Sequence, residues 1–461
     1  MTKEHEDLEA QPSGSLSRDG SRKFVQPADV RGRFTFRRDL IFAFLIILLV
    51  AVPFIHMGGH PVLFLDVEHR QFFLFGRTFN AQDFWLSFFI LSGVGFALIV
   101  VTTAWGRIWC GYTCPQTVFL EGVYRRIERI LEGPRERRIR RNAGPWNVDK
   151  IWRKLVKHLL FAAVSLVLAH VFLSYFVSLP ALTQMVMHSP AEHAEAFGWV
   201  AVMSVLLYAN FAWFREQLCL VVCPYGRLQS VLTDDDSLVI GYDTARGEPR
   251  GKVKDTSAGD CIDCGRCVKV CPTGIDIRNG LQIECIGCAA CVDACDEIML
   301  KVKRKPGLVR YDSLLGLAGK PRRFWRPRLA FYAVLGLVGL VAASVAFHSH
   351  TNFEANLLRP RGAPFATTEG EVRNTLDLHL VNKYSDATTF RLEGIHGDAL
   401  TYVFPIPEIT LGSLASRHIP VMVSIPEASL QPRLRAHVRV VPIGHEEDSV
   451  IVDEPFVGPV H

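Results

Sequence analysis

The stretch that decides the fold reads Cys261-Ile-Asp-Cys264-Gly-Arg-Cys267-Val-Lys-Val-Cys271-Pro272, followed by Cys285-Ile-Gly-Cys288-Ala-Ala-Cys291-Val-Asp-Ala-Cys295. Each run has the Cys-x2-Cys-x2-Cys-x3-Cys spacing of bacterial ferredoxins that bind cubane iron–sulfur clusters. Four-thiolate zinc sites also use Cys-x2-Cys pairs, but a doubled run of four cysteines fits zinc poorly. The stretch therefore predicts two [4Fe-4S] clusters and a protein that moves electrons.

The fourth cysteine of each run ligates the other cluster in two-cluster ferredoxins. The expected ligands of cluster one are Cys261, Cys264, Cys267 and Cys295. The expected ligands of cluster two are Cys271, Cys285, Cys288 and Cys291.

The remaining four cysteines form Cys110-x3-Cys114-Pro115 and Cys219-x3-Cys223-Pro224. Iron–sulfur clusters need reduced thiols, so we do not expect permanent disulfides. Positions i and i+4 of a helix share a face, so each pair should present its sulfurs side by side. If the two copies face each other, four thiols converge. Such thiols favour monovalent copper, zinc or clusters, could cycle as redox thiols, or are simply small buried residues.

The apolar residues are concentrated in five runs, which predicts a membrane protein. The candidate spans are Leu40–Ile55, Phe84–Ala104, Leu159–Leu179, Trp199–Phe214 and Leu329–Phe347. The first and fourth must borrow flanking residues, because a hydrocarbon core of ~30 Å needs about 20 apolar residues. The first run begins too far from the N-terminus for a cleavable signal peptide, and no small-residue cleavage site follows it.

Lysine and arginine residues set the expected orientation. They precede the first span, crowd the loop between spans two and three, and are absent from residues 180–198. The N-terminus, the cysteine pairs and the ferredoxin segment are therefore predicted to be cytoplasmic, with the C-terminal domain in the periplasm of a bacterium and the spans in its inner membrane. The net charge of +5 is explained by these basic flanks next to membrane lipid and requires no nucleic-acid partner.

The predicted fold class is a multi-domain membrane protein with an α-helical five-span unit, an α+β two-cluster ferredoxin domain and an all-β immunoglobulin-like sandwich. The sandwich is inferred from period-two alternation in segments such as 375–381 and 436–441. The predicted parts are a disordered cytoplasmic tail (1–30), an internally repeated four-span unit with both Cys-x3-Cys-Pro motifs (31–230), the ferredoxin domain (231–300), a basic linker (301–328), a fifth transmembrane helix (329–347) and the sandwich (351–461).

After Pro115, Phe119, Val123, Ile127 and Ile130 share one face of a predicted helix whose other side is basic. Such a helix suits the surface of an anionic leaflet, and packing on the ferredoxin domain is the alternative.

Histidine and methionine residues are weaker candidates for copper ligands. They cluster at the ends of spans that the topology places outside, where ordinary interfacial residues are the alternative. The candidates are His56, His60, Met185, Met187 and His188, with Met57, His193, His348 and His350 nearby. His170 lies within span three and is either a functional intramembrane residue or a histidine satisfied inside the bundle.

Taken together, the chain resembles the cytochrome c oxidase accessory protein family known as CcoG, FixG or RdxA. The resemblance rests on Cys110-Gly-Tyr-Thr-Cys114-Pro115, Cys219-Leu-Val-Val-Cys223-Pro224, the two ferredoxin runs, and the final span with its sandwich domain. The second run is particularly similar to the family's motif, with Asp296 where soluble ferredoxins usually carry proline. The membrane unit is also similar to NapH- and NosR-type membrane ferredoxins, from which the tail domain separates it.

The resemblance implies reduction of Cu(II) to Cu(I) in support of assembly of the cbb-type cytochrome c oxidase. The predicted function is thus a membrane cupric reductase, in which a cytoplasmic donor reduces the clusters. The predicted redox or copper site consists of Cys110, Cys114, Cys219 and Cys223. The expected partners are oxidase subunits or copper-delivery proteins, and a homodimer could complete two half-sites.

Two alternatives belong to other classes. The protein could be a transmembrane electron conduit to quinone or a periplasmic acceptor, or a non-enzymatic scaffold that escorts oxidase subunits. The sequence has no Cys-x2-Cys-His motif, so any haem would need bare histidines such as His170.

Overall fold

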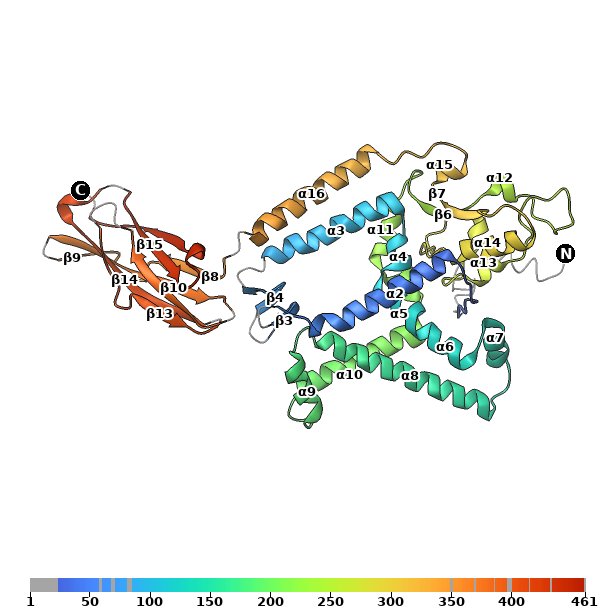
Figure 1. Cartoon of the computed structure of the whole chain (residues 1–461), viewed down its shortest axis with the longest axis horizontal. Helices are drawn as coiled ribbons and strands as arrows, with labels where there is room; N and C mark the ends of the chain where they lie inside the picture. Colours follow the sequence, from blue (N-terminus) through green and yellow to red (C-terminus); the bar gives the residue numbers. More distant parts are fainter. Residues whose placement is uncertain are drawn as a thin grey trace. The chain divides into compact units, whose positions relative to one another are not determined.

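The structure is a computed structural model, and it divides into two compact units (Figure 1). One comprises Met1–Phe54 and Phe88–Ala342, and the other comprises Ile55–Ser87 and Ala343–His461. The residues described are 24–57, 60–67, 71–80, 85–348, 351–368, 370–384, 386–395, 400–413, 415–431 and 433–459.

Four helices among the described residues are long and apolar enough to cross a membrane. They lie in α3 (Trp85–Trp105), α8 (Val148–Leu173), α10 (Ala194–Ala209) with its π-helical extension η4 (Asn210–Phe214), and α16 (Pro327–His348). These helices correspond to the second to fifth predicted spans. Span three starts earlier than expected and ends at Leu173, after which the short helix α9 (Leu179–Met187) begins.

The predicted first span forms helix α2 (Arg33–Ala51), which is not among the four. Its first two turns carry Arg33, Arg37, Arg38 and Asp39. The apolar remainder from Leu40 covers about 18 Å at 1.5 Å per residue, well short of the hydrocarbon core of ~30 Å. The prediction of five spans is therefore not confirmed, and the described residues support four.

Short helices connect the long ones and carry the cysteine motifs. These are α4 (Ile108–Tyr112), α5 (Pro115–Phe119), α6 (Arg125–Glu132), α7 (Arg135–Ala143) and α11 (Pro224–Leu232), with π-helical turns η3 (Leu120–Tyr124) and η5 (Leu218–Val222). Single π-helical turns are frequently found at functional sites. Here they accompany both copies of the Cys-x3-Cys-Pro motif.

The two halves of the predicted repeat pack together at an aromatic core. Tyr124, after the first motif, stacks on Phe211, before the second, with ring centroids 4.5 Å apart. The hydroxyl of Tyr124 lies 2.8 Å from that of Ser165 on α8. The apolar face predicted after Pro115 packs in this core, and not on the ferredoxin domain, except for the exposed Ile130.

The ferredoxin segment is closed by an antiparallel pair, β6 (Val239–Tyr242) and β7 (Val309–Asp312). Between them lie α12 (Thr244–Gly247), α13 (Arg266–Lys269), the 3-10 turn η6 (Ile277–Asn279) and α14 (Ala290–Lys301), and α15 (Leu314–Leu317) follows. The predicted boundary at residue 300 is therefore too early. The first part of the expected linker belongs to the ferredoxin fold, because β7 supplies half of its sheet.

The last residues of the predicted disordered tail are held by backbone contacts. Ala28 is buried, and its N–H donates to Lys269 O at 2.7 Å. Arg138 Nη2 donates to Pro27 O at 2.9 Å. Residues 24–30 are thus part of the folded unit, while residues 1–23 lie outside the described residues.

The second unit contains short strands that the sequence reasoning missed. They form a pair and a three-stranded meander that follow the 3-10 turn η1 (Val52–Phe54). The strands are β1 (His56–Met57), β2 (His60–Pro61), β3 (Leu63–Asp66), β4 (Gln71–Leu74) and β5 (Arg77–Asn80). Two to four residues are too few for a period-two pattern to register in the sequence.

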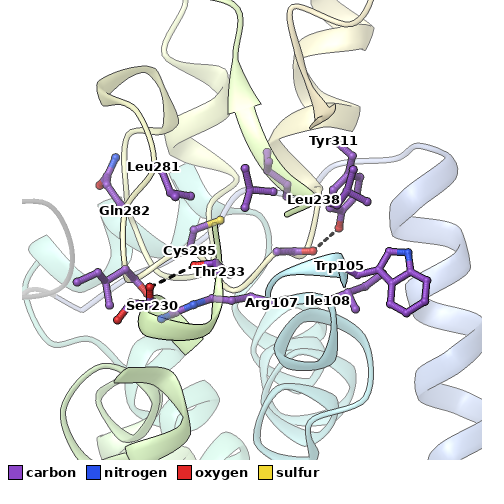
Figure 2. Close-up of a pocket in the computed structure, with 14 residues that line it drawn as sticks. Trp105, Arg107, Ile108, Ser230, Thr233, Leu238, Leu281, Gln282, Cys285 and Tyr311 are labelled. Carbon is purple, nitrogen blue, oxygen red and sulfur yellow. Dashed lines mark hydrogen bonds between the residues drawn. The ribbon is translucent and has the colours of Figure 1, made fainter. Parts of the chain in front are cut away.

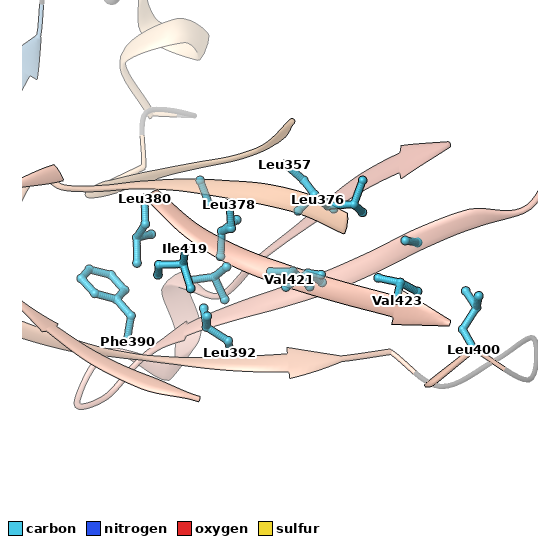
Figure 3. Close-up of a cluster of buried hydrophobic side chains, with 14 of the residues drawn as sticks. Leu357, Leu376, Leu378, Leu380, Phe390, Leu392, Leu400, Ile419, Val421 and Val423 are labelled. Carbon is cyan, nitrogen blue, oxygen red and sulfur yellow. The ribbon is translucent and has the colours of Figure 1, made fainter. Parts of the chain in front are cut away.

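The C-terminal domain consists of two antiparallel sheets around one apolar core (Figure 3). The first sheet contains β8 (Phe353–Leu358), β9 (Ala366–Thr368), β10 (Glu371–Asn382), β12 (Thr401–Val403) and β14 (Ser416–Pro426). The second contains β11 (Thr388–Gly394), β13 (Glu408–Leu411), β15 (Arg435–Pro442) and β16 (Val450–Pro455). The predicted two-sheet all-β architecture is confirmed. Alternate residues such as Leu378 and Ile419, which pair across β10 and β14, face this core.

Candidate iron–sulfur and thiol sites

The first cysteine cavity lies between the loop at residues 261–267 and helix α14. It holds about 370 Å³ of empty space, and its walls include Cys261, Cys264, Cys267 and Cys295. The loop is tight because Asp263 and Gly265 adopt left-handed backbone conformations, with φ of 52° and 61°. The four sulfurs expected to bind cluster one are thus brought to one cavity.

A second cavity of about 330 Å³ repeats this arrangement, with Cys271, Cys285, Cys288 and Cys291 in its walls. Gly287 and Ala289 take the left-handed positions here, with φ of 68° and 59°. Helix α14 continues through Asp296, whose Oδ1 accepts a hydrogen bond of 2.8 Å from Gly307 N. The missing proline therefore lets this helix extend past Cys295, and Cys295 still lines the first cavity.

These cavities fit a multi-atom anionic group better than one metal ion. Within the described residues, no three His, Cys, Asp or Glu side chains lie close enough to hold a single ion. Burial raises the pKa of the Cys285 thiol to about 12 and that of Cys288 to about 11, so thiolates there need a cationic iron core to form.

The buried guanidinium of Arg38 supplies a second indication. Its Nε and Nη1 have no hydrogen-bond partner among the described residues. Burial alone would lower the pKa of Arg38, but the charges of Cys288, Glu121, Asp39 and Tyr112 together outweigh burial and raise it. A buried cation beside the second cavity suits a cluster with thiolate ligands, which carries net negative charge.

The second cavity lies directly against the helix that carries Cys110. A Cβ added to Gly111 would come within 2.8 Å of Ile286 O, and one added to Gly287 within 3.0 Å of Arg107 O. Both distances are too short for ordinary packing, so these two glycines let the backbones touch. Cys110 also packs in one apolar cluster with Cys288 and Cys291. The cluster-two loop and the first membrane-surface motif are therefore in direct contact.

The four remaining thiols lie near enough for their charges to interact, but they are not on continuous helices, and no three of them lie close enough to hold a single ion. Cys110 lies in α4 and Cys219 in η5, whereas Cys114 and Cys223 are the N-caps of α5 and α11. The prediction of one helix per pair is wrong, because Pro115 and Pro224 each start a new helix. Proline suits this first helical position since its missing N–H has no partner to lose.

The charges of these thiols affect one another's pKa values, which indicates that the thiols lie near one another. Burial raises the pKa of Cys110 to about 11 and that of Cys219 to about 12, and the charges of the other thiols raise both further. The fully buried Gln229 donates from Nε2 to Cys110 Sγ at 3.4 Å. We call Cys110, Cys114, Cys219 and Cys223 the thiol quartet. At neutral pH the uncomplexed Cys110 and Cys219 thiols are protonated, so binding a soft metal ion there must release protons.

A buried charge network, missed by the sequence reasoning, joins the motifs to the ferredoxin domain. Arg125 is 2% exposed, and its Nη2 lies 3.1 Å from Glu216 Oε2. The same guanidinium donates from Nη1 to Pro272 O, directly after Cys271, at 3.1 Å. Arg107 likewise donates to Ile283 O and Gly226 O. Charged residues on an amphipathic helix look like a solvated face in sequence, which is why the network could not be recognised.

The histidine and methionine candidates are divided between the two units. His56, Met57 and His60 lie on β1 and β2 of the second unit, whereas Met185, Met187 and His188 lie in or just after α9 of the first. His193 is the N-cap residue of α10. No group of three possible metal ligands is found among the described residues. His350 and the side chain of His348 lie outside them.

His170 has an ordinary partner. Its Nδ1 lies 2.8 Å from Leu166 O, one turn earlier in α8. The alternative of a locally satisfied histidine therefore describes it.

Comparison with known families matches three stretches of the chain. Residues 214–314 match a 4Fe-4S dicluster domain and residues 86–134 a 4Fe-4S binding domain. Residues 344–459 match the IG-like fold at the C-terminus of FixG. With its apolar helices and two cysteine cavities, the protein is therefore a membrane-associated iron–sulfur electron-transfer protein.

Curated relatives identify the family, within this class, to which the chain belongs. Protein RdxA of Cereibacter sphaeroides is 35% identical over 383 residues, which cover 80% of this chain and 81% of that protein. Nitrogen fixation protein FixG of Rhizobium meliloti is 32% identical over 416 residues, covering 80% and 79%. The chain belongs to the FixG/RdxA family, which includes the CcoG proteins.

The chain is also similar to a third curated relative and to one solved structure. Protein RdxB of Cereibacter sphaeroides is 34% identical over 392 residues, covering 80% of this chain and 82% of that protein. A crystal structure of a FixG-related protein from Vibrio parahaemolyticus aligns over 24% of this chain and all of its own, at 15% identity and a TM-score of 0.22. That score is too low to carry an argument about the fold.

Proposed function

We propose that the protein is a cupric reductase that passes single electrons from its ferredoxin clusters to Cu(II) at the thiol quartet. The Cu(I) formed would support assembly of a cbb-type cytochrome c oxidase, the role that the family resemblance implies. Cluster one is assigned to Cys261, Cys264, Cys267 and Cys295. Cluster two is assigned to Cys271, Cys285, Cys288 and Cys291.

The observation that carries this proposal is the contact between Gly111 and the cysteine loop at Ile286 and Gly287. It places the cluster-two ligands next to the helix of Cys110, while Arg125 ties Pro272 to the same region. Cluster one has no such contact among the described residues that line its cavity. The inferred order of electron transfer is therefore cluster one, cluster two and then the quartet.

The chemistry of the quartet suits the product. Bound clusters supply one electron at a time, which matches the one-electron reduction of Cu(II). Thiolates are soft ligands and stabilise Cu(I) over Cu(II), so binding at the quartet favours the reduction. Burial keeps the unbound Cys110 and Cys219 thiols protonated, so they are poor nucleophiles until a metal ion arrives.

The proposed location is the bacterial inner membrane, with the ferredoxin domain and the quartet on the cytoplasmic side. The support is the charge distribution: α7 is dense in arginine, whereas residues 180–198, which include most of α9, contain no Lys or Arg. With α16 as the last span, the C-terminal domain is then periplasmic and available to oxidase subunits or copper-delivery proteins.

The test uses anaerobically purified protein with its clusters reduced. Added Cu(II) should re-oxidise the clusters while a specific chelator traps an equal amount of Cu(I). Replacing all four quartet cysteines by serine should abolish this reaction and leave the iron content unchanged. Thr113→Ser, between two quartet thiols, is the matched control and should react normally. Equal rates with and without the quartet thiols would refute the assignment of the copper site.

A further inference from the structure

A third cavity lies beside the second cysteine cavity, with which it shares two lining residues. Figure 2 shows the residues that line the third cavity. Its volume is about 130 Å³, below the range of 300–1,000 Å³ that is usual for drug-sized ligands, so it suits one small ring or head group. Its walls combine the end of α3, the loop before Cys285, and the strands β6 and β7. Most of the lining is apolar, including Trp105, Leu238 and Ile283. The thiol quartet does not line it, so it is a separate site.

The cavity shares a wall with the cluster-two site. Cys285 and Ile240 line both cavities, so one layer of side chains separates them. A molecule bound in the third cavity would be in contact with a ligand of cluster two. The position is suited to a redox-active ligand that exchanges electrons with cluster two.

The surroundings of the cavity indicate a ligand that comes from the membrane. Trp105 is the last residue of the apolar helix α3, and tryptophan is enriched where a membrane meets water. Leu281 and Ile283, on the loop that forms another wall, are 49% and 60% exposed. Exposed apolar side chains next to the end of a spanning helix suit contact with lipid. An apolar molecule can therefore enter without crossing water.

The polar groups of the wall indicate a ligand that donates hydrogen bonds. Gln282 Nε2 donates to Asp276 O, but its Oε1 is buried without a partner among the described residues. Tyr311 Oη is already used, because it donates to Gly287 O. Arg107 also has its guanidinium occupied by Ile283 O and Gly226 O. The free group is thus an acceptor, which fits the hydroxyl of a hydroquinone.

We propose that this cavity binds the head group of a membrane quinol and that the quinol reduces the clusters. Oxidation of one quinol to quinone releases two electrons and two protons. One electron goes to each cluster, and the protons go to water at the membrane surface. Two Cu(II) ions then take one electron each. Two one-electron centres in one domain thus match a two-electron donor to a one-electron substrate.

This inference rests on the proposed function only through the assignment of cluster two, and it gives the electron donor a chemical class. The first test is binding, which does not depend on copper. Full-length protein in nanodiscs is irradiated with a photoreactive azidoquinone, and the labelled peptides are mapped. Labelling should fall in segments 105–108, 230–240 or 281–287 and be competed by decylubiquinone.

The second test is electron transfer from decylubiquinol to oxidised clusters, followed anaerobically by the loss of cluster absorbance. Leu281→Trp, which fills the cavity from a partly exposed position, should slow this transfer at least tenfold. Leu281→Ala leaves the cavity open and should keep the rate near that of the natural chain. Leu337→Trp, on the exposed face of α16, controls for a new tryptophan at the membrane.

Dithionite reduction and re-oxidation by Cu(II) separate the two proposals. Both should be unchanged in Leu281→Trp, which shows that the clusters and the copper site are intact. Labelling elsewhere, or equal quinol rates in Leu281→Trp and Leu281→Ala, would overturn the quinol site and leave the cupric reductase standing. Loss of Cu(II) reduction from dithionite-reduced protein would overturn the reductase instead.

Discussion

Glu128 shows how one residue can hold together elements far apart in the chain. It lies on α6 and is only 5% exposed. Its carboxylate pairs with Arg215, which precedes the second motif, with Arg138 on α7 and with Lys157 on α8. Burial alone would raise the pKa of Glu128, but these cations outweigh it and hold the pKa at about 2.

Glu128→Gln should strongly destabilise the membrane unit, because the buried Arg215 and Arg138 lose the carboxylate with which they pair. Breaking a buried ion pair from one side costs about 3–5 kcal/mol. The expected result is a clear fall in the thermal unfolding temperature of the purified protein in detergent. Glu136→Gln, an exposed carboxylate on α7, is the matched control and should change little.

The same residue predicts a dependence on pH. The folded pKa of about 2 lies below the ordinary value of 4.5, so the stabilisation is complete above about pH 4.5 and is lost as the pH falls toward 2. The shift corresponds to about 3 kcal/mol at 1.36 kcal/mol per pKa unit. The thermal unfolding temperature of the natural chain should therefore fall over this pH window by more than that of Glu128→Gln. Parallel pH profiles for the two proteins would contradict the role of Glu128.

Gly111 is the basis of a third prediction at this scale. In Gly111→Ala the new Cβ would lie 2.8–2.9 Å from Ile286 O and Gly287 O, so α4 and the cysteine loop must move apart. We expect re-oxidation of reduced clusters by Cu(II) to slow several-fold or more, with the iron content unchanged. Gly198→Ala is the control, since a Cβ there meets no described atom within 4 Å. An unaltered rate in Gly111→Ala would mean that electrons leave the clusters by another route.

Among the elements, helix α2 contacts the ferredoxin domain in a way that its sequence does not predict. Asp293 of α14 accepts hydrogen bonds from Phe34 N at 3.2 Å and from Thr35 N and Oγ1 at 2.7 Å. A carboxylate from another helix therefore caps the N-terminus of α2. Gly32 permits the approach, because a Cβ there would lie 2.2 Å from Asp293 Cγ. The charged first turns that shorten α2 as a span are the part that docks on the ferredoxin domain.

Asp293→Ala should release this end of α2, at a cost of about 1–2 kcal/mol for a lost cap. Hydrogen exchange of residues 24–39 should then accelerate while the spans stay protected. Glu297→Ala, one turn further along α14, is the control because its carboxylate pairs with Lys301 alone among the described residues. Unchanged exchange in Asp293→Ala would show that other contacts hold α2 in place.

Long apolar helices and closely spaced local motifs could be predicted from the sequence. Contacts between segments that lie far apart in the chain could not. The runs behind α3, α8, α10 and α16 are long enough to register by composition alone. The cysteine spacing likewise sorted eight sulfurs into the two cavities. Strand β7 was assigned to a linker because its partner β6 lies far away in the chain. The contact of Gly111 with Gly287 joins two distant segments, and no pattern within either one reveals it.

For the whole molecule, the division into two units predicts separable functions. All twelve cysteines lie in the first unit, whereas the C-terminal domain has its own two-sheet core. Deleting residues 351–461 should therefore leave the iron content and Cu(II) reduction near normal. If the C-terminal domain escorts oxidase subunits, the same deletion should abolish assembly of the oxidase in cells. Loss of the clusters in the truncated protein would contradict this independence.

The order of the elements along the chain has a consequence for biogenesis. Arg107 donates a hydrogen bond to Ile283 O, and Arg125 donates one to Pro272 O. Both arginines belong to segments that the ribosome makes before the two ferredoxin cysteine runs. The segments that carry Arg107 and Arg125 are therefore translated before the first ferredoxin cysteine is added. By then, three of the four described apolar helices are also available for insertion into the membrane. Iron delivery would then meet a nascent domain that is already anchored. A chain stalled after β7, still without α16, already contains all eight assigned cluster ligands.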